Sequence, residues 1–380
     1  MYVSNVPLSH ACNTFYSLQK GEKRTFRGYM KPTVQGAFNW RFTYQNTVDS
    51  TWADGQYSRA DLPGGHFRIL HAGVCACGKD LNVLSAQTVC FDQHPDREVQ
   101  PGDIVISDSV HLAIPQDGYV MFSWCIEALE EKCILPATPD SRALVYIAMD
   151  EQAQTAPLDA FHLLNEDEEE PGVLPCLWEA ERESVTHKMA FIGDSITQGC
   201  QTRLNYYEQW AARIIRGLPQ NIAGLNIGLG YARAQDAARN GAWLRKLRDF
   251  DVVNVCLGVN DIFQMTETED HADVLSRNLE NTVRLIRQNT PHAKVVLFTI
   301  PPFSMEEKEE AVRESVNGCI RKTALGADAV FDMEILAVPD TRGKARFGDH
   351  PDGVGGAAVA GEYLTHFLPE HQHLLFAKAK

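Results

Sequence analysis

The sequence lacks any long hydrophobic run, and none of its apolar stretches approaches the roughly 18 residues that a membrane-spanning helix requires. Its opening residues, "MYVSNVPLSHACNTF", have neither the basic start nor the apolar stretch of a secretory signal peptide. Positive charge is also scarce: 35 lysines and arginines face 50 acidic residues, which gives a formal net charge of -15. Because a nucleic acid or an anionic membrane would be repelled, we expect neither as a partner. The sequence thus predicts a soluble, cytoplasmic protein.

Metal-binding motifs are missing as well. Cys75 and Cys77 form a C-x-C, but no second pair of cysteines or histidines stands at the spacing of a zinc site. We therefore expect no metal ion, and nothing in the sequence calls for another cofactor. The ten cysteines are expected to be reduced thiols, since a chain of this size without a signal peptide does not need a disulfide framework.

Short alternating segments fill the first part of a chain that, at 380 residues, is long enough for two globular domains. In "FNWRFTYQN", Phe38, Trp40, Phe42 and Tyr44 share one face and polar residues share the other, as in a half-buried strand. Trp40 and Tyr44 are therefore expected in a core rather than in a sugar-stacking platform. Many such strands with turn signals and little helical period predict a jelly-roll-like β-sandwich over residues 1–165.

A strongly acidic run, "NEDEEEPG", follows at residues 165–172. Such a run is usually solvated, so we expect a connector over residues 166–184. Beyond it, apolar strands such as "MAFI", "VVNVCLG" and "KVVLFTI" alternate with amphipathic helices, one of them expected over residues 233–248. This alternation predicts a second domain over residues 185–380, with a three-layer α/β/α fold and a parallel sheet that helices cover on both faces.

Polar residues gather in the loops that follow these strands. In a parallel sheet the carboxyl ends of the strands meet at one edge, so loops 193–199, 228–232 and 258–261 are expected to lie together. The loop before the last helix, which contains His350, can reach the same edge. The sequence therefore predicts a functional site at this edge of the sheet.

Ser195 and His350 have the chemistry of a nucleophile and its base. A serine hydroxyl attacks only when a base takes its proton, and a histidine does this near neutral pH. The side-chain amide of Asn260 and the backbone N–H groups of Ser195 and Gly230 would stabilise the oxyanion. Each feature alone also fits a structural role, since Asp194 and Ser195, for example, could cap a helix. The joint occurrence of all these residues at one edge of the sheet favours a site for acyl transfer to water.

Four short blocks resemble, in the same order, those of the GDSL or SGNH hydrolase family: "GDSIT" (193–197), "NIGLG" (226–230), "GVND" (258–261) and "DHPDGVG" (349–355). The G-x-S-x-G motif of ordinary α/β-hydrolases is absent. The resemblance implies a flavodoxin-like domain with a five-stranded sheet and the activity of a serine esterase. It also implies Ser195 as the nucleophile, His350 as the base, and an oxyanion hole formed by Asn260 and a backbone amide of the second block. The preceding β-domain resembles the jelly roll in front of the hydrolase domain in family 2 carbohydrate esterases.

Two positions depart from the family pattern. Phe347 stands three residues before His350, where the family usually has an aspartate that orients the imidazole. Either the neighbouring Asp349 takes that role, or Ser195 and His350 form a dyad that a carbonyl group supports. Tyr231 stands where many members have a glycine of the second block, but a tyrosine still offers its backbone N–H.

The sequence leaves three functions open. The combination of a β-domain with a hydrolase-like domain favours a serine esterase that removes acetyl groups, with a small-molecule or oligosaccharide ester as its substrate. A lipase-like or thioesterase acylhydrolase for longer acyl chains is the first alternative, and a non-catalytic glycan-binding protein is the second. The sequence also leaves a homo-oligomer open.

Overall fold

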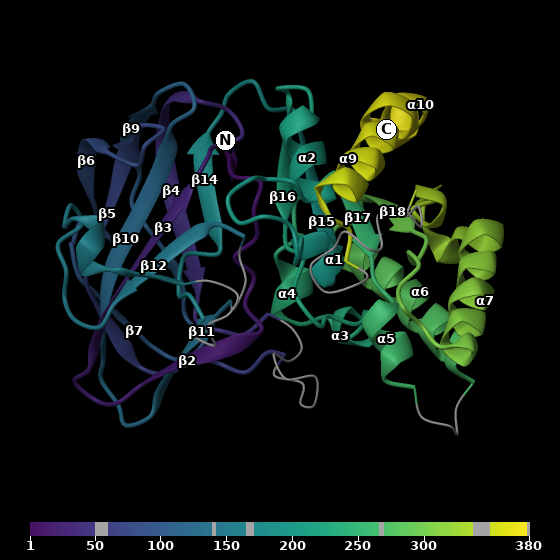
Figure 1. Ribbon diagram of the computed structural model, residues 1–380, viewed down its shortest axis with the longest axis horizontal. Coiled ribbons are helices and arrows are strands. Elements are labelled where there is room, and N and C mark those ends of the chain that lie inside the picture. The colour runs from purple at the N-terminus through teal and green to yellow at the C-terminus, as the bar shows by residue number, and fades with distance from the viewer. Residues whose placement is uncertain (50–59, 139–141, 165–170, 266–269, 337–349, 378–380) are drawn as a thin grey trace. The chain divides into compact units, whose positions relative to one another are not determined.

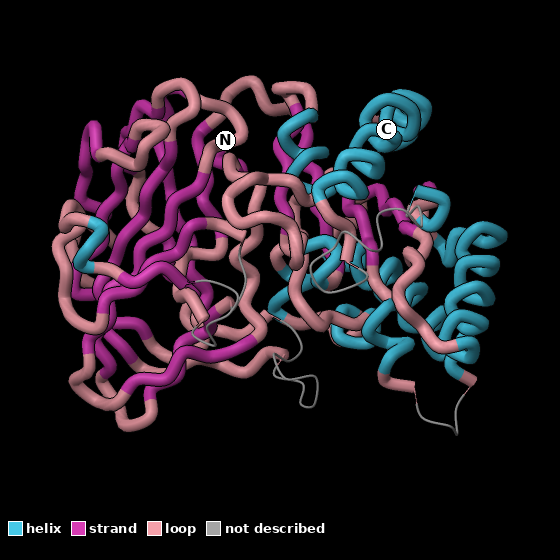
Figure 2. Tube along the Cα trace, viewed as in Figure 1, coloured by secondary structure: helices cyan, strands magenta, loops and turns pink. Residues whose placement is uncertain are grey.

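The computed structural model describes residues 1–49, 60–138, 142–164, 171–265, 270–336 and 350–377 (Figures 1 and 2). These residues form two compact units, one made of Met1–Asp49 with Asp61–Val185 and the other containing Thr186–Lys380. The first unit holds antiparallel sheets and the second holds a parallel sheet with helices, so the predicted fold class is confirmed. Within the described residues, no helix combines the length and the apolar character needed to cross a membrane.

The first unit contains two large antiparallel sheets and a small one. The strands of one large sheet, in spatial order, are β1 (Tyr2–Ser4), β14 (Leu177–Glu181), β4 (Gly36–Gln45) and β8 (Ile104–Ile106), with β9 (Val110–Ile114) also paired to β4. The strands of the other are β13 (His162–Leu164), β12 (Leu144–Ala148), β3 (Lys23–Met30), β10 (Tyr119–Ala128), β5 (Phe67–Cys77) and β6 (Val83–Val89), with β7 (Arg97–Val99) paired to β5. The small sheet joins β11 (Cys133–Ala137) to β2 (Thr14–Leu18), and a short 3-10 helix, η1, covers Leu158–Ala160.

Aromatic side chains of the two large sheets meet in the core of the first unit. Phe42 on β4 lies 4.7 Å from Phe122 on β10 and 5.6 Å from Trp178 on β14, measured between ring centroids. Trp40, Phe42 and Tyr44 are at most 2% exposed, because the alternation of β4 turns one of its faces toward the other sheet. The prediction of a core role for Trp40 and Tyr44 is therefore confirmed.

Strand β14 lies inside the stretch 166–184 that was expected to be a connector. It pairs antiparallel with β1 and with β4, and Trp178 stands opposite Phe42 in the second ladder. Trp178 and Ala180 are buried, because alternate residues of the strand face the core. The structure thus differs from the prediction here, and residues 165–170 of the acidic run lie outside the described residues.

The second unit is built on a five-stranded parallel sheet. Its strands, in spatial order, are β16 (Ile222–Asn226), β15 (His187–Gly193), β17 (Val252–Cys256), β18 (Lys294–Phe298) and β19 (Ala329–Phe331). Nearly all of their residues are buried, as expected for a parallel sheet that is covered on both faces. The carboxyl ends of β15 and β17 are neighbours, because these two strands pair directly.

Helices connect these strands and pack in two groups (Figure 1). α2 (Trp210–Gly217) contacts α9 (Gly353–Glu362), and α6 (His271–Asn289) contacts both α3 (Ala234–Ala237) and α7 (Glu307–Thr323). Further elements are α1 (Ser195–Gln198), α4 (Ala242–Arg245), α5 (Val259–Phe263), α10 (Leu368–Leu375), η2 (Ala324–Gly326), η3 (Glu334–Leu336) and the π-helical turn η4 (Tyr363–Phe367). The helix expected over residues 233–248 is divided into α3 and α4, because Asn240 between them has a left-handed backbone with a φ of 59°.

Candidate active site

The turn after β15 carries Ser195 at the carboxyl end of the parallel sheet. Asp194 precedes the short helix α1, and its side chain accepts a hydrogen bond from a backbone N–H of that helix at 2.9 Å. Asp194 thus caps the helix, and the half-buried Ser195 keeps its hydroxyl for another partner. Gly193 is needed in this turn, because a β-carbon there would lie 2.0 Å from Thr197 Oγ1 and 2.5 Å from the carbonyl oxygen of Cys256.

His350 lies against Ser195, although 155 positions separate the two residues. The distance from His350 Nε2 to Ser195 Oγ is 2.8 Å, which is within hydrogen-bonding range. The loop that carries His350 leads into α9, which Asp352 caps by accepting hydrogen bonds from the N–H groups of Val354 and Gly355, both at 2.9 Å. Because α9 packs on α2, the end of this loop is fixed by contacts between helices of the second unit.

The loop 228–230 lies against α1. The side chain of Asn226 accepts a hydrogen bond from the N–H of Gly228 at 2.7 Å and donates one to the carbonyl oxygen of Thr197 at 3.0 Å. Gly228 permits this close approach, since a β-carbon there would lie 2.3 Å from a backbone nitrogen of α1. Gly230 therefore belongs to a loop that is bonded to the helix that begins with Ser195.

Asn260 follows β17 and lies in α5. Its Nδ2 donates a hydrogen bond to the carbonyl oxygen of Ala232 at 3.0 Å, and the amide nitrogen carries a second hydrogen. The carboxylate of Asp261 accepts hydrogen bonds from the N–H groups of Ala234 at 2.8 Å and Gln235 at 3.3 Å. These two neighbouring residues thus tie α5 to the segment that follows residue 230.

Asn226 and Asp261 are site residues to which the sequence analysis assigned no role. Both stand inside the blocks "NIGLG" and "GVND". Their residue types could have revealed them, because asparagine and aspartate side chains often bind backbone N–H groups in loops. Tyr231, which departs from the family pattern, has a left-handed backbone with a φ of 61° and a side chain that is 49% exposed.

A buried carboxyl group, that of Asp194, and a half-buried one, that of Asp261, lie at the site. Burial raises the pKa of Asp194 to about 7, and the charge of Asp261 adds to this rise. Burial likewise raises the pKa of Asp261 to about 7, although the hydrogen bonds that it accepts from Ala234 and Gln235 oppose the shift. Near neutral pH the site therefore carries less negative charge than its acidic residues suggest, which limits repulsion of a developing oxyanion.

The predicted site residues are placed as follows. Ser195 and His350 are in direct contact. Hydrogen bonds link the loop of Gly230 to α1, and another hydrogen bond links α5 to the segment that follows this loop. Asp349 and Phe347 lie outside the described residues. In the parts of the chain that the structure describes, no three His, Cys, Asp or Glu side chains cluster in a way that could hold a metal ion.

Residues 191–367 match the model of a family described as GDSL-like lipase/acylhydrolase. This stretch contains all of the predicted site residues, from the serine of the first block to the histidine of the last. A comparison with curated proteins gives no match.

Several solved carbohydrate esterases are similar to this chain. A family two carbohydrate esterase from Clostridium thermocellum, in complex with cellohexaose, is 14% identical over 97% of this chain and 99% of its own, with a TM-score of 0.42. The acetyl xylan esterase Est2A from Butyrivibrio proteoclasticus is 12% identical over 97% of this chain and 92% of its own, with a TM-score of 0.40. A family 3 carbohydrate esterase from Talaromyces cellulolyticus is 21% identical over 51% of this chain and 100% of its own, with a TM-score of 0.39.

Proposed function

We propose that Ser195 is the nucleophile of this chain and that His350 is its base. The premise is that residues 191–367 belong to the GDSL-like lipase/acylhydrolase family and that the chain is an ester hydrolase. One observation carries the proposal: His350 Nε2 lies 2.8 Å from Ser195 Oγ, although the two residues come from opposite ends of the matched stretch. A histidine nitrogen at this distance can take the hydroxyl proton as the oxygen attacks.

The proposed reaction has two halves. Ser195 Oγ attacks the carbonyl carbon of the ester while His350 Nε2 takes the hydroxyl proton, and the histidine then gives this proton to the leaving alcohol as the C–O bond breaks. A water molecule attacks the acyl-serine that results, and His350 accepts one of its protons. Collapse of the second intermediate releases the carboxylic acid, and the histidine returns its proton to the serine oxygen.

Three N–H donors are proposed to hold the oxyanion in both halves. The N–H of Ser195 stands at the first position of α1, where the helix itself offers no acceptor. Gly230 supplies a second backbone N–H, and Asn260 supplies the hydrogen of its amide that does not bind Ala232. Removing one such donor typically lowers kcat by about 10²–10³-fold.

The proposed substrate is an acetylated oligosaccharide. This part of the proposal is supported by the sequence, in which a β-sandwich precedes the hydrolase domain as it does in the family 2 carbohydrate esterases that the chain resembles. In this proposal the first unit, including β14, is an accessory β-sandwich and residues 185–380 perform the reaction. Asp349 or a backbone carbonyl group orients His350. The contact between Ser195 and His350 supports the reaction type, whereas the acyl length needs its own experiment.

Hydrolysis of 4-nitrophenyl acetate and 4-nitrophenyl octanoate by the wild type and by Ser195→Ala tests the proposal. We expect cleavage of the acetate, little cleavage of the octanoate, and a loss of at least about 10³-fold in Ser195→Ala. Release of acetate from acetylated xylo- and cello-oligosaccharides then tests the sugar. Faster cleavage of the octanoate would instead favour the lipase-like alternative, and a wild type that cleaves no ester would favour the glycan-binding protein.

A further inference from the structure

An aromatic ring stands directly against the proposed base. Phe303 belongs to the loop that follows β18, and its ring centroid lies 5.1 Å from that of His350 at an interplanar angle of 81°. Phe263, the last residue of α5, makes a similar edge-to-face contact with Phe303 at 5.5 Å and 71°. Edge-to-face contact is a preferred geometry of such ring pairs. The ring of Phe303 therefore lies between the rings of Phe263 and His350 and restricts how the His350 ring can turn.

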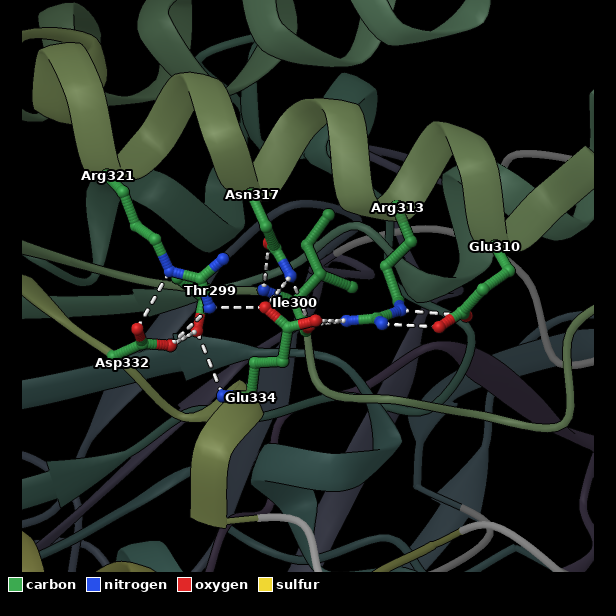
Figure 3. Close-up of polar contacts among 8 residues, drawn as sticks. All are labelled: Thr299, Ile300, Glu310, Arg313, Asn317, Arg321, Asp332 and Glu334. Atoms are coloured by element: carbon green, nitrogen blue, oxygen red, sulfur yellow. Dashed lines mark hydrogen bonds and ion pairs between the residues drawn. The ribbon is translucent and has the colours of Figure 1, made fainter.

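The loop that carries Phe303 is fixed three residues earlier. The N–H of Ile300 donates a hydrogen bond to Asn317 Oδ1 at 2.7 Å, and the carbonyl oxygen of Ile300 accepts one from Asn317 Nδ2 at 2.8 Å (Figure 3). The same carbonyl oxygen accepts another from Arg313 Nη1 at 3.0 Å. Both residues between Ile300 and Phe303 are prolines, which restrict the backbone between the anchor and the ring.

A charged network holds the two side chains of α7 that form this anchor. Arg313 is 3% exposed and pairs with the carboxylates of Glu310 and Glu334, the latter at 2.6 Å (Figure 3). Asn317 is fully buried and donates a hydrogen bond to Glu334 Oε2 at 3.2 Å. Because Glu334 binds both side chains of the anchor, neither can move without breaking a bond to this carboxylate.

We infer that Phe303 is a positioning residue for the reaction proposed above, because it holds the imidazole of His350 at the angle from which Nε2 meets Ser195 Oγ. A histidine ring turns about its χ2 bond, and a hydrogen bond weakens steeply when donor and acceptor leave alignment. The ring of Phe303 stands nearly perpendicular to the imidazole at contact distance and so opposes this rotation. The inference rests on the proposed function, since a histidine without a chemical task would not need a fixed angle.

The test compares Phe303→Leu, which removes the ring, with Phe303→Tyr, which keeps it. Phe376→Leu is the matched control, because Phe376 is half-buried like Phe303 and its ring contacts another histidine, His187, at a centroid distance of 4.8 Å. Each full-length variant is assayed for kcat and KM with 4-nitrophenyl acetate. The rate at which phenylmethanesulfonyl fluoride modifies Ser195 is measured as well, because this reaction needs an activated serine and does not depend on the fit of the ester.

We expect Phe303→Leu to lower both kcat and the rate of sulfonylation by about tenfold, with KM within about twofold of the wild type. Phe303→Tyr and Phe376→Leu should keep both rates within about threefold of the wild type. If thermal unfolding shows that Phe303→Leu is not folded at the assay temperature, Phe303→Met takes its place, because methionine fills the space of the ring without its planar face.

Wild-type values of kcat and sulfonylation in Phe303→Leu would overturn the positioning role. An effect confined to KM would do the same, and so would an equal loss in Phe376→Leu. Ser195→Ala, measured beside these variants, keeps two failures apart. If Ser195→Ala still cleaves the ester, the proposed function itself fails, whereas an inactive Ser195→Ala with an unaffected Phe303→Leu removes only the role of Phe303.

Discussion

Asp194 and Ser195 are adjacent side chains that point to different partners. Asp194 is 1% exposed, caps α1, and has its pKa raised to about 7 by burial. Ser195 is half-buried and contacts His350. Because Asp194 caps the helix, the hydroxyl of Ser195 can contact His350 instead. The sequence allowed a helix cap or a nucleophile in this turn, and the cap is Asp194 while the proposed nucleophile is Ser195.

Asp194→Asn separates the charge of this residue from its cap, since the asparagine oxygen can still accept the hydrogen bond. The pKa of about 7 in the folded state lies above the ordinary value of 3.8, so folded molecules hold a proton that unfolded ones release between these values. From about pH 5 to about pH 8, the wild type should lose about 2–3 kcal/mol more unfolding free energy than the variant. Urea unfolding at several pH values measures this difference, and parallel pH curves for the two proteins would contradict it.

Asn260→Ala tests the side-chain donor of the proposed oxyanion hole. We expect kcat with 4-nitrophenyl acetate to fall by about 10²–10³-fold and KM to change little, because the donor meets charge that develops only in the transition state. Asn289→Ala, at the end of α6, provides a control with the same change of residue type. A variant of Asn260 that keeps the kcat of this control would exclude Asn260 from the oxyanion hole.

At the scale of the element, α7 shows how a helix can fix loops at the edge of a sheet. A capping box between Glu306 and Glu309 closes its first turn, and acidic side chains there suit the positive end of the helix dipole. Further along, Arg313 and Asn317 bind Ile300, the second residue after β18, and Glu334, the first residue of η3 (Figure 3). Polar residues one turn apart on a single helix face thus hold two loops in place.

Arg313→Met should lower the free energy of unfolding by about 3–5 kcal/mol, because Glu310 and Glu334 lose the buried cation between them. Arg321→Met changes another member of the network, but the Arg321 side chain is 40% exposed, so its loss should cost about 1 kcal/mol or less. Denaturant unfolding with a common m-value compares the two variants. Losses of the same size would contradict the buried position of Arg313 as the cause.

Local patterns allowed much of these elements to be predicted. The alternation in β4 and the apolar runs of β15, β17 and β18 follow from the period of side chains along a strand. Strand β14 was missed because its five residues follow an acidic run and its partner β4 lies far away in the chain. The break between α3 and α4 was missed because Asn240 adopts a left-handed backbone inside a stretch that otherwise favours a helix.

The same limit applies to the candidate site. Residue type and the order of the four blocks led to the prediction of Ser195, Asn260 and His350, because the carboxyl ends of parallel strands meet at one edge. Phe303 and Arg313 carry no such signal. The role of Phe303 follows from its ring contact with His350, and the role of Arg313 follows from its hydrogen bond to the carbonyl oxygen of Ile300. Neither contact can be read from a local sequence pattern.

At the scale of the whole molecule, burial controls the chemistry of the thiols. All ten cysteines are described and none of them forms a disulfide, and Cys12, Cys75, Cys77, Cys125, Cys133 and Cys256 are buried. Burial raises the pKa of the Cys75 thiol to about 11 and that of the Cys77 thiol to about 12. Such thiols hold almost no thiolate near pH 8, and the thiolate is the reactive form.

Titration with 5,5′-dithiobis(2-nitrobenzoic acid) near pH 8 should therefore modify at most the four half-buried cysteines quickly in the folded protein: Cys90, Cys176, Cys200 and Cys319. After unfolding in guanidinium chloride without a reductant, all ten should react. Rapid modification of more than four in the folded state would contradict their burial. Fewer than ten in the unfolded state would reveal a disulfide.

Trapping of the acyl-enzyme tests directly whether Ser195 is acylated with His350 as its base. The wild type, His350→Ala and Ser195→Ala are mixed with 4-nitrophenyl acetate, quenched in acid, and digested for peptide mass spectrometry. We expect one acetyl group on Ser195 in the wild type, acylation slowed by at least about 10³-fold in His350→Ala, and no label on this peptide in Ser195→Ala. Turnover with the acetyl group on another residue would exclude Ser195 as the nucleophile, and wild-type acylation of Ser195 in His350→Ala would exclude His350 as the base.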